Sequence, residues 1–289
     1  MPNAELTCVF WDVQHGNATY INTPANEHIV IDLGVGSYKQ PNVPFSPLLH
    51  LKRKYGVRQL DGVVITHPHR DHLDDIGNFD ALSPRVLSRP KHLREADVHG
   101  GNLPASPVVE EYLRISARYN QPVSPEESPF SPPWSGGHTI TKFTPTACSR
   151  DNLNNHSIVT VVTYAGLKLL IPGDNEPPSW DELLAQPDFV QAIGGTDILL
   201  APHHGRESGF SPALFDRIQP RLTVISDGRF GDTSATARYV GVTRGWKVHH
   251  RLTGDSEQRK CLTTRRDGVV IVKCGYSAGN RPYLNVTVD

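Results

Sequence analysis

The sequence predicts an α+β fold in which two mostly antiparallel or mixed sheets pack face to face with helices outside, a four-layer αβ/βα sandwich. The chain has two β-rich halves, and in each half helix-like segments follow strands. Its 289 residues, 37% of them hydrophobic, are enough to bury a large core. We expect one domain over residues 1–289.

The first half opens with segments rich in β-branched and aromatic residues, which favour strands. The turn-forming sequence at 22–26 separates two of them, so we expect an antiparallel meander. The expected elements are strands over 6–11, 18–22 and 28–32, a helix over 47–55 ended by Gly56, a strand over 63–66, a helix starting at 73–82 and a short strand at 86–87.

Residues 89–138 interrupt this pattern with recurring prolines and with glycine pairs at 100–101 and 136–137. One helix is expected there, over 108–119, where apolar residues recur near helical spacing. Connections this long are usually functional or disordered. We therefore expect a Pro-rich, lid-like connection over one face of the molecule.

The second half repeats the organisation of the first, with strands followed by helices. The expected elements are strands over 158–164, 167–171, 197–201, 222–226, 247–250 and 268–274, and helices over 177–185, 212–218 and 236–242.

The strand over 63–66 ends in the sequence Thr66-His67-Pro68-His69-Arg70-Asp71-His72. Histidine and carboxylate side chains are natural ligands of zinc and of harder divalent metals. On an extended loop, His67 and His69 point the same way because they are two residues apart. Asp71 and His72 then face a second position as the next helix begins. This loop predicts two adjacent metal sites.

Isolated His and Asp residues at other strand ends supply further ligands. His156 stands just before the strand at 158–164, Asp174 follows the strand at 167–171, and His203 and His204 follow the strand at 197–201. An aspartate in the middle position can bridge two metals and hold a hydroxide between them. Of His203 and His204, one is expected to bind metal. The other is expected to contact the substrate or one of the metal-binding side chains.

Structural roles compete with these assignments. Asp174 could serve only as a turn residue after glycine, and His156 only as a polar residue beside a strand. The other histidines, including His15 and the pair His249-His250, are expected to be structural. The spacing within residues 66–72 favours metal binding over an ordinary surface role.

Residues 66–72 resemble the H-x-H-x-D-H signature of the metallo-β-lactamase superfamily, with its aspartate strand at 170–174 and its last histidine at 201–205. The likeness is closer to the metallo-β-lactamase-like domain of the DNA-uptake channel protein ComEC and its stand-alone relatives. Further motifs of that subgroup correspond to 12–17, 31–34 and 154–159. The resemblance extends from about residue 6 to about residue 275 and implies the metallo-β-lactamase fold.

The resemblance also implies a set of metal ligands. For the first ion these are His67, His69 and His156, and for the second Asp71, His72 and His204. Asp174 would bridge the two ions. His204 is preferred to His203 because the superfamily's final ligand usually adjoins glycine, and His203 stays an alternative. Zn²⁺ is the expected metal, with Mn²⁺ or Fe²⁺ as alternatives.

The chain departs from the subgroup at several positions. The first element, 12–17, is altered, and Arg206 replaces the serine that closes the late histidine motif. The loop over 226–236 lacks the histidine that the subgroup often carries there. We expect Arg206, Asp227 and Ser234 to contact the substrate, so substrate choice should depend on these departures.

Composition narrows the class of protein further. The formal net charge is −1, which gives no support to sequence-independent nucleic-acid binding. The four cysteines form no C-x-x-C pair, and Cys8 and Cys274 are expected to be reduced core residues. No N-terminal apolar segment resembles a signal peptide, and no apolar run is long enough to span a membrane. We expect a cytoplasmic protein without a membrane partner.

The predicted function is a binuclear metal-dependent hydrolase, a phosphodiesterase or nuclease acting on nucleic acid or a nucleotide-derived substrate. A metal-bridging hydroxide would attack, with Asp71 orienting it and His203 as a second catalytic candidate. Arg206 would bind phosphate, as would Arg89, Lys91 and Arg94 from the 89–138 connection, and no apolar acyl pocket is obvious. The alternatives are hydrolysis of a lactone, ester or thioester, and a partner-binding role in a defence or toxin system.

Overall fold

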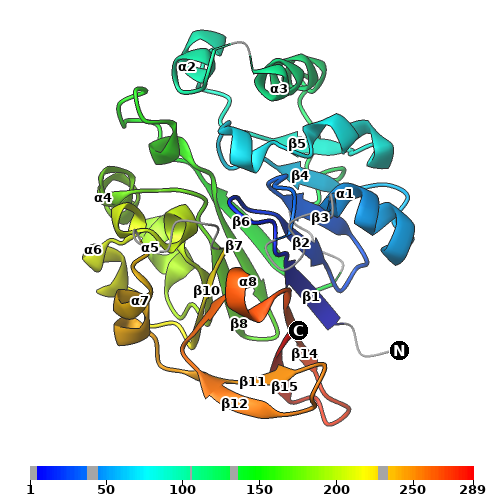
Figure 1. The fold of residues 1–289 in the computed structure, drawn as a ribbon, viewed down its shortest axis with the longest axis vertical. Helices are drawn as coiled ribbons and strands as arrows, with labels where there is room; N and C mark the ends of the chain where they lie inside the picture. Colours follow the sequence, from blue (N-terminus) through cyan, green and yellow to red (C-terminus); the bar gives the residue numbers. More distant parts are fainter. Residues whose placement is uncertain (1–4, 38–44, 105, 131–135, 227–233) are drawn as a thin grey trace.

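The computed structural model describes residues 5–37, 45–104, 106–130, 136–226 and 234–289. Two mixed sheets with helices on their outer sides confirm the predicted sandwich (Figure 1). The strands are β1 (Glu5–Phe10), β2 (Thr19–Asn22), β3 (His28–Ile31), β4 (Gly62–Val64), β5 (Val86–Ser88), β6 (Thr139–Phe143), β7 (Val159–Tyr164), β8 (Leu167–Ile171), β9 (Ile198–Leu200), β10 (Leu222–Ile225), β11 (Trp246–His250), β12 (Ser256–Arg259), β13 (Cys261–Thr263), β14 (Val270–Tyr276) and β15 (Pro282–Val288).

Helices and short helical turns connect the strands. The helices are α1 (Pro47–His50), α2 (Glu95–Gly100), α3 (Pro107–Arg118), α4 (Pro177–Leu184), α5 (Pro187–Ile193), α6 (Pro212–Phe215), α7 (Thr236–Val242) and α8 (Thr264–Asp267). The short turns are η1 (Leu51–Tyr55), η2 (Arg70–His72), η3 (Ile76–Leu82), η4 (Leu153–His156), η5 (Pro202–Gly205) and η6 (Glu207–Gly209).

The two sheets differ in size. Within the described residues, the first has the strand order β12-β11-β15-β14-β1-β2-β3-β4-β5, and the second has the order β13-β10-β9-β8-β7-β6. β1, β2 and β3 pair antiparallel, which confirms the meander, whereas β3, β4 and β5 pair parallel. β8, β9 and β10 are also parallel. Because parallel strands end at the same edge of a sheet, the loops after β8, β9 and β10 lie together.

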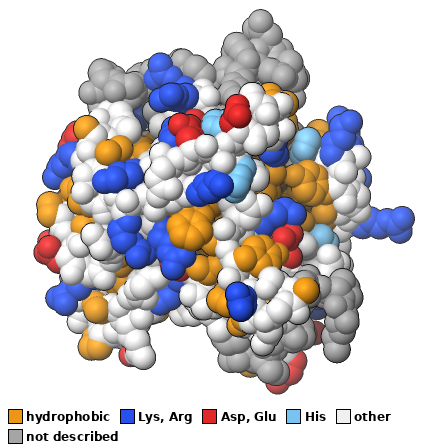
Figure 2. Space-filling view, turned by 90° about the horizontal axis from the view of Figure 1, so that it is seen from below, with side chains coloured by type: hydrophobic (Ala, Val, Ile, Leu, Met, Phe, Trp, Pro, Cys, Tyr) orange, Lys and Arg blue, Asp and Glu red, His pale blue; other side chains and the backbone are white. Residues whose placement is uncertain are grey.

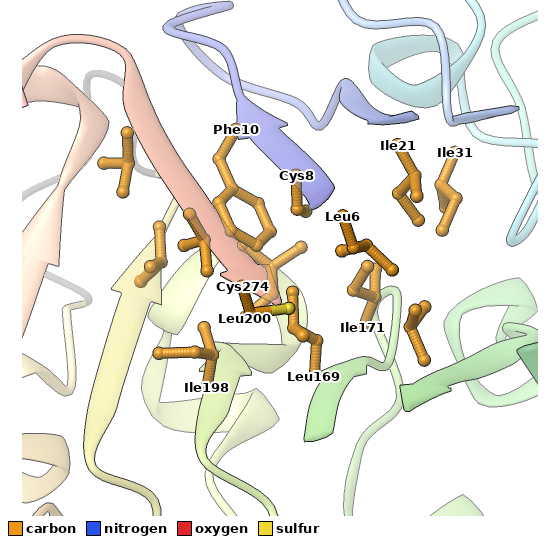
Figure 3. Close-up of a cluster of buried hydrophobic side chains, with 14 of the residues drawn as sticks. Leu6, Cys8, Phe10, Ile21, Ile31, Leu169, Ile171, Ile198, Leu200 and Cys274 are labelled. Carbon is orange, nitrogen blue, oxygen red and sulfur yellow. The ribbon is translucent and has the colours of Figure 1, made fainter. Parts of the chain in front are cut away.

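The main core lies between the sheets. Leu6, Cys8 and Phe10 share one face of β1 because side chains alternate along a strand, and they point toward Leu169 and Ile171 of β8 (Figure 3). All five side chains are almost completely buried. Full burial of a large apolar side chain contributes about 1.5–3 kcal/mol, so this interface holds the sheets together. Cys8 and Cys274 are buried and free, as expected.

Two further clusters cover the outer faces of the sheets. Trp11, on the opposite face of the first sheet, packs in a cluster with Leu48 of α1 and Ile115 of α3. On the second sheet, Trp180 of α4 and Tyr239 of α7 belong to another buried cluster. Helices α4 to α7 lie together on the left of Figure 1, on the outer side of this sheet. The molecule thus has the four layers that the sequence predicts.

Some elements differ from the expectation. The segment after the metal loop forms the 3₁₀ turn η3 instead of an α-helix, and its Gly77-Asn78 pair has low helix propensity. The 89–138 connection contains α2 as well as the expected helix, α3. The strands β6, β12, β13 and β15 were not expected. The single-domain organisation and the lid-like role of 89–138 stay predictions.

Cationic side chains are spread over one face of the molecule. In Figure 2, Lys and Arg side chains recur across the face shown, between hydrophobic and uncharged groups. Over the whole sequence the formal net charge is −1. Among the described helices, none combines the length and the apolar character needed to cross a membrane.

Candidate metal centre

The 66–72 loop follows a strand of the first sheet and contacts the second sheet. Thr66 follows β4 closely, and its carbonyl oxygen accepts a hydrogen bond from the backbone N–H of Ile158, at 2.9 Å, just before β7 of the other sheet. Gly173, after β8, packs against the same loop. A Cβ at this position would lie 2.8 Å from the Cβ atoms of Thr66 and Ser157, and the φ of Gly173 is +61°. This close approach places Asp174 beside the loop.

Four side chains converge at this edge of the sheets. They are Asp71, His72, Asp174 and His204, and one ligand atom of each lies within 4.8 Å of the others. His204 Nε2 is 3.2 Å from Asp71 Oδ2 and 3.1 Å from Asp174 Oδ2. His72 Nε2 is 3.3 Å from Asp174 Oδ1. Two imidazoles and two carboxylates so arranged fit a divalent ion such as Zn²⁺ or Mn²⁺.

Each imidazole of this group is fixed through its other nitrogen. His72 Nδ1 is 2.8 Å from Oδ2 of the fully buried Asp32. His204 Nδ1 is 3.2 Å from the carbonyl oxygen of Ser226. Both rings therefore turn Nε2 into the cluster, and the two Nε2 atoms are 3.2 Å apart. Metal-binding histidines are commonly oriented in this way.

Further ring nitrogens face Asp174. His67 Nε2 lies 4.0 Å from Asp174 Oδ2 and 2.9 Å from His69 Nδ1. His203 Nε2 lies 3.9 Å from the same carboxylate oxygen, and its Nδ1 is 2.9 Å from Glu176 Oε1. Asp174 is therefore shared by two groups of histidines, an arrangement that suits a bridging carboxylate.

His156 is not brought into either group. Its Nδ1 is 2.9 Å from His92 Nε2, and its Nε2 is 3.2 Å from the carbonyl oxygen of Ser149. Both ring nitrogens are thus engaged elsewhere. Another residue of the same turn, Asn154, is buried and lies against His69.

Unusual backbone conformations surround the cluster. Asp32, His203 and His204 all have positive φ values, of 60°, 48° and 53°. Such conformations cost free energy in non-glycine residues and persist only where the surrounding structure enforces them. Here they direct the Asp32 carboxylate toward His72 and bring two successive histidines to the same carboxylate, Asp174.

The charges of the cluster compensate one another. Burial raises the pKa of Asp174, but His204 and His72 outweigh it and hold the pKa well below its ordinary value. Burial opposes protonation of His204, yet Asp174 and Asp71 raise its pKa to about 9. Burial and the neighbouring His72 lower the pKa of His67. Without an ion, protons on His72 and His204 balance the carboxylates, and a divalent cation would replace those protons.

The predicted substrate contacts are placed in part. Arg206 is half-buried, and its Nη2 lies 3.2 Å from His15 Nε2, which in turn is 3.5 Å from Asp71 Oδ2. Ser234 pairs with Arg206 in an isolated β-bridge. Asp227 lies outside the described residues. His15, expected to be structural, thus belongs to the site, and its place in the altered 12–17 motif is the signal that could have revealed it.

Gly16 lets the 12–17 segment approach the metal loop. Its φ is +137°, and a Cβ would lie 2.3 Å from the carbonyl oxygen of Asp71. We expect Gly16→Ala to reduce stability by about 1–3 kcal/mol, because the loop must shift, and to weaken metal binding. Thermal unfolding with and without metal measures both effects.

Gly241→Ala, at an exposed position of α7 where a Cβ meets nothing within 4 Å, is the matched control. Equal unfolding temperatures for the two variants would contradict the role of Gly16.

A cavity of about 550 Å³ adjoins the cluster. His69 and Asp71 form one side of it, and Leu103, Pro107 and Val108 form another. The sequence shows no obvious apolar pocket, and the apolar side formed by Leu103, Pro107 and Val108 is seen only in the folded chain. It offers an uncharged part of a substrate a surface next to the metal ligands.

Comparison with known proteins agrees with this geometry. The family model of the metallo-beta-lactamase superfamily matches residues 11–226. The competence protein ComA of Neisseria gonorrhoeae is 24% identical over 232 residues, which cover 79% of this chain and 28% of that protein. ComE operon protein 3 of Bacillus subtilis is 22% identical over 236 residues, 75% of this chain and 28% of that protein. The chain therefore spans little more than a quarter of these relatives.

Among the solved structures that match this chain is the short form of human tRNase Z. The two chains share 12% sequence identity with a TM-score of 0.39, over 77% of this chain and 93% of the other. The family model, which spans most of the chain and all of the clustered histidines and aspartates, is the stronger finding.

Proposed function

The chain belongs to the metallo-beta-lactamase superfamily, and on this premise we propose that it is a binuclear metal-dependent phosphodiesterase that acts on nucleic acid or a nucleotide-derived substrate. The observation that carries the proposal is the Arg206 guanidinium, which reaches the metal cluster through His15. A cation beside a His/Asp cluster suits the anionic oxygens of a phosphodiester. The names of the matched relatives, a competence protein and a ComE operon protein, support the same subgroup.

The geometry supports a revised set of ligands. For one ion it favours Asp71, His72, His204 and Asp174, and for the other His67, His69, His203 and Asp174. His203 replaces His156 in this proposal because Glu176 fixes its Nδ1 and leaves Nε2 toward Asp174. Bound divalent ions would activate a water molecule and offset negative charge on the substrate.

The chain's own residues would position the substrate. Burial and the nearby His204 lower the pKa of His15 to about 4, so this imidazole is neutral near pH 7. Its Nε2 then accepts a hydrogen bond from Arg206 and orients the guanidinium toward the cluster. Arg206 would bind a non-bridging phosphate oxygen, and Asp71, at the boundary between cluster and solvent, would orient the attacking water.

A panel of phosphodiesters tests the proposal. Wild-type protein with Zn²⁺ or Mn²⁺ is expected to cleave at least one of single-stranded DNA, double-stranded DNA, RNA and cyclic nucleotides. Asp71→Ala is expected to be inactive, whereas Asp216→Ala, an exposed aspartate of the same charge, keeps full activity. If no member of the panel is cleaved, or if Asp71→Ala cleaves like wild type, the proposal is wrong.

The choice between His203 and His156 has its own test. His203→Ala is expected to lose one of the two bound ions because its Nε2 faces Asp174. His156→Ala is expected to keep both ions, since neither of its ring nitrogens reaches the cluster. Metal analysis of purified variants measures this, with His249→Ala as a control. Loss of an ion from His156→Ala alone would restore the assignment implied by the family resemblance.

The apolar cavity beside His69 and Asp71 favours a second candidate function. Leu103, Pro107 and Val108 would accommodate the hydrocarbon part of a lactone, ester or thioester. This function predicts turnover of uncharged esters by wild type, with no dependence on Arg206. Arg206→Met separates the two candidates, because it should impair cleavage of phosphodiesters and leave cleavage of neutral esters intact.

A further inference from the structure

A second cavity, of about 590 Å³, lies at the edges of the two sheets. Its lining includes Ser88 of β5 and Lys142 of β6, which are the edge strands of the first and second sheets. No residue of the proposed ligand set lines it. Its volume is in the range typical of small-molecule sites.

The cavity is lined by an excess of cations. They are Arg85, Arg89, Lys91, Arg118 and Lys142, against a single carboxylate, Glu127, among the described lining residues. Two of the cations have partners outside. Arg85 Nη1 is 3.5 Å from Asp61 Oδ1, and Arg118 Nη2 is 2.7 Å from Asp80 Oδ1. The remaining three cations outnumber Glu127, so the lining is left with an excess of positive charge.

Arg89 and Lys91 carry no carboxylate partner within the described part of the chain. Arg89 donates to the carbonyl oxygens of Ser116, at 2.7 Å, and Tyr119, at 3.3 Å, which fixes the guanidinium without neutralising it. Lys91 is exposed at the rim. The sequence suggested that both residues bind phosphate above the metal centre, whereas in the structure both are among the residues that line this cavity.

Lys142 is the most enclosed of these cations. Its Nζ donates to Ser88 Oγ at 2.5 Å and lies 3.6 Å from the centre of the Phe130 ring. No carboxylate among the described residues forms an ion pair with it. Burial, together with the nearby Lys91, lowers its pKa to about 8. A half-buried ammonium group is stabilised by an anion, and no described carboxylate forms an ion pair with this one.

We propose that this cavity binds the phosphate group of an organic phosphate, through Arg89, Lys91 and Lys142. The apolar side chains of Leu87, Phe130 and Ile158 line the same cavity and would contact an uncharged part of the ligand. Two sources share this chemistry, a free mononucleotide and a segment of a nucleic-acid strand. The site is separate from the metal ligands, so it stands whether or not the protein is a phosphodiesterase.

Binding is tested by calorimetric titration at low salt in the full-chain Asp71→Ala protein, which is expected not to cleave the probes. The probes are adenosine 5′-monophosphate, a short oligothymidylate and, as the phosphate-free control, adenosine. Lys142→Met removes the enclosed charge at nearly constant volume, and Lys91→Met removes the exposed one. Lys247→Met, an exposed lysine of β11, is the matched control.

We expect Lys142→Met to weaken binding of a phosphate-bearing probe by roughly ten- to a hundredfold, the effect of losing a charged hydrogen bond. Lys91→Met should weaken it less, and Lys247→Met not at all. If these variants weaken binding of the monophosphate alone, the site is assigned to a free nucleotide. If they weaken binding of the oligothymidylate, it is assigned to a nucleic-acid strand.

If no phosphate-bearing probe binds, the inference fails. It also fails if adenosine binds as tightly as its monophosphate, or if Lys142→Met, Lys91→Met and Lys247→Met all bind like the Asp71→Ala protein that carries none of them. Unfolding temperatures of the variants establish that each remains folded, and the exposed Lys91→Met keeps the test open if Lys142→Met does not fold.

Discussion

Asp174→Asn is expected to reduce the rate of hydrolysis by about a hundredfold or more. Changing a residue that only hydrogen-bonds a metal ligand usually costs about 10- to 100-fold, and Asp174 is expected to contact the metal itself. Asp174 Oδ2 is 3.1 Å from His204 Nε2, 3.9 Å from His203 Nε2 and 4.0 Å from His67 Nε2. Its other oxygen faces His72. The amide keeps the size of the side chain but removes the charge that both groups of histidines share. Initial rates, measured together with the metal content, test this.

The neighbouring Asn175→Asp exchange is not a neutral control, because the Asn175 amide nitrogen donates to two carbonyl oxygens. Asp188→Asn, in the first turn of α5, makes the same chemical change at an exposed position outside the cluster. Full activity of Asp174→Asn, with both ions retained, would contradict the bridging role.

Asp32→Ala is expected to destabilise the fold by about 3–5 kcal/mol, the range for breaking a buried charged pair. The Asp32 carboxylate accepts from the backbone N–H of Thr66 at 2.7 Å and from the Thr66 hydroxyl at 2.8 Å. Asn17 Nδ2 donates to it at 3.1 Å, and His72 Nδ1 lies 2.8 Å away. Alanine would leave these buried groups unpaired. Chemical denaturation of the metal-free protein measures the loss.

Asp32→Asn distinguishes the contribution of Asp32 to fold stability from its role in orienting the His72 ring. Asparagine tolerates the positive φ at this position and keeps part of the hydrogen bonding. It should therefore be milder in denaturation, yet lower metal affinity roughly ten- to a hundredfold, because His72 loses the carboxylate that fixes its Nδ1. Unchanged metal affinity in both variants would show that Asp32 is only structural.

Much of the fold could be predicted because its signals are local. The alternation of Leu6, Cys8 and Phe10 identifies β1 and its inner face, and the β-branched run before His67 identifies β4. Elements with weak periodicity were missed. β12, with the sequence Ser-Glu-Gln-Arg, is almost entirely exposed, and its strand conformation comes from pairing with β11.

The residues of the candidate site also differ in how far the local sequence predicts them. Asp71, His72, Asp174 and His204 could be identified because each follows a strand end in a motif of recognisable spacing. The contacts that orient them could not be predicted, because Ser226 and Glu176 meet their histidines through tertiary packing that local sequence does not encode. His156 illustrates the limit: its position before β7 suits a ligand, but the turn η4 directs the ring toward His92.

Metal titration of the chelator-treated wild-type protein tests directly whether the site is a two-metal phosphodiesterase centre. Hydrolysis of the preferred phosphodiester is followed as Zn²⁺ or Mn²⁺ is added to a known concentration of chain. A two-metal site predicts no activity without metal and a rise in activity that levels off at two equivalents, with neither activity nor tight metal binding in Asp71→Ala. Phosphodiester cleavage that persists in the chelator-treated protein, or that is independent of Asp71, would contradict it.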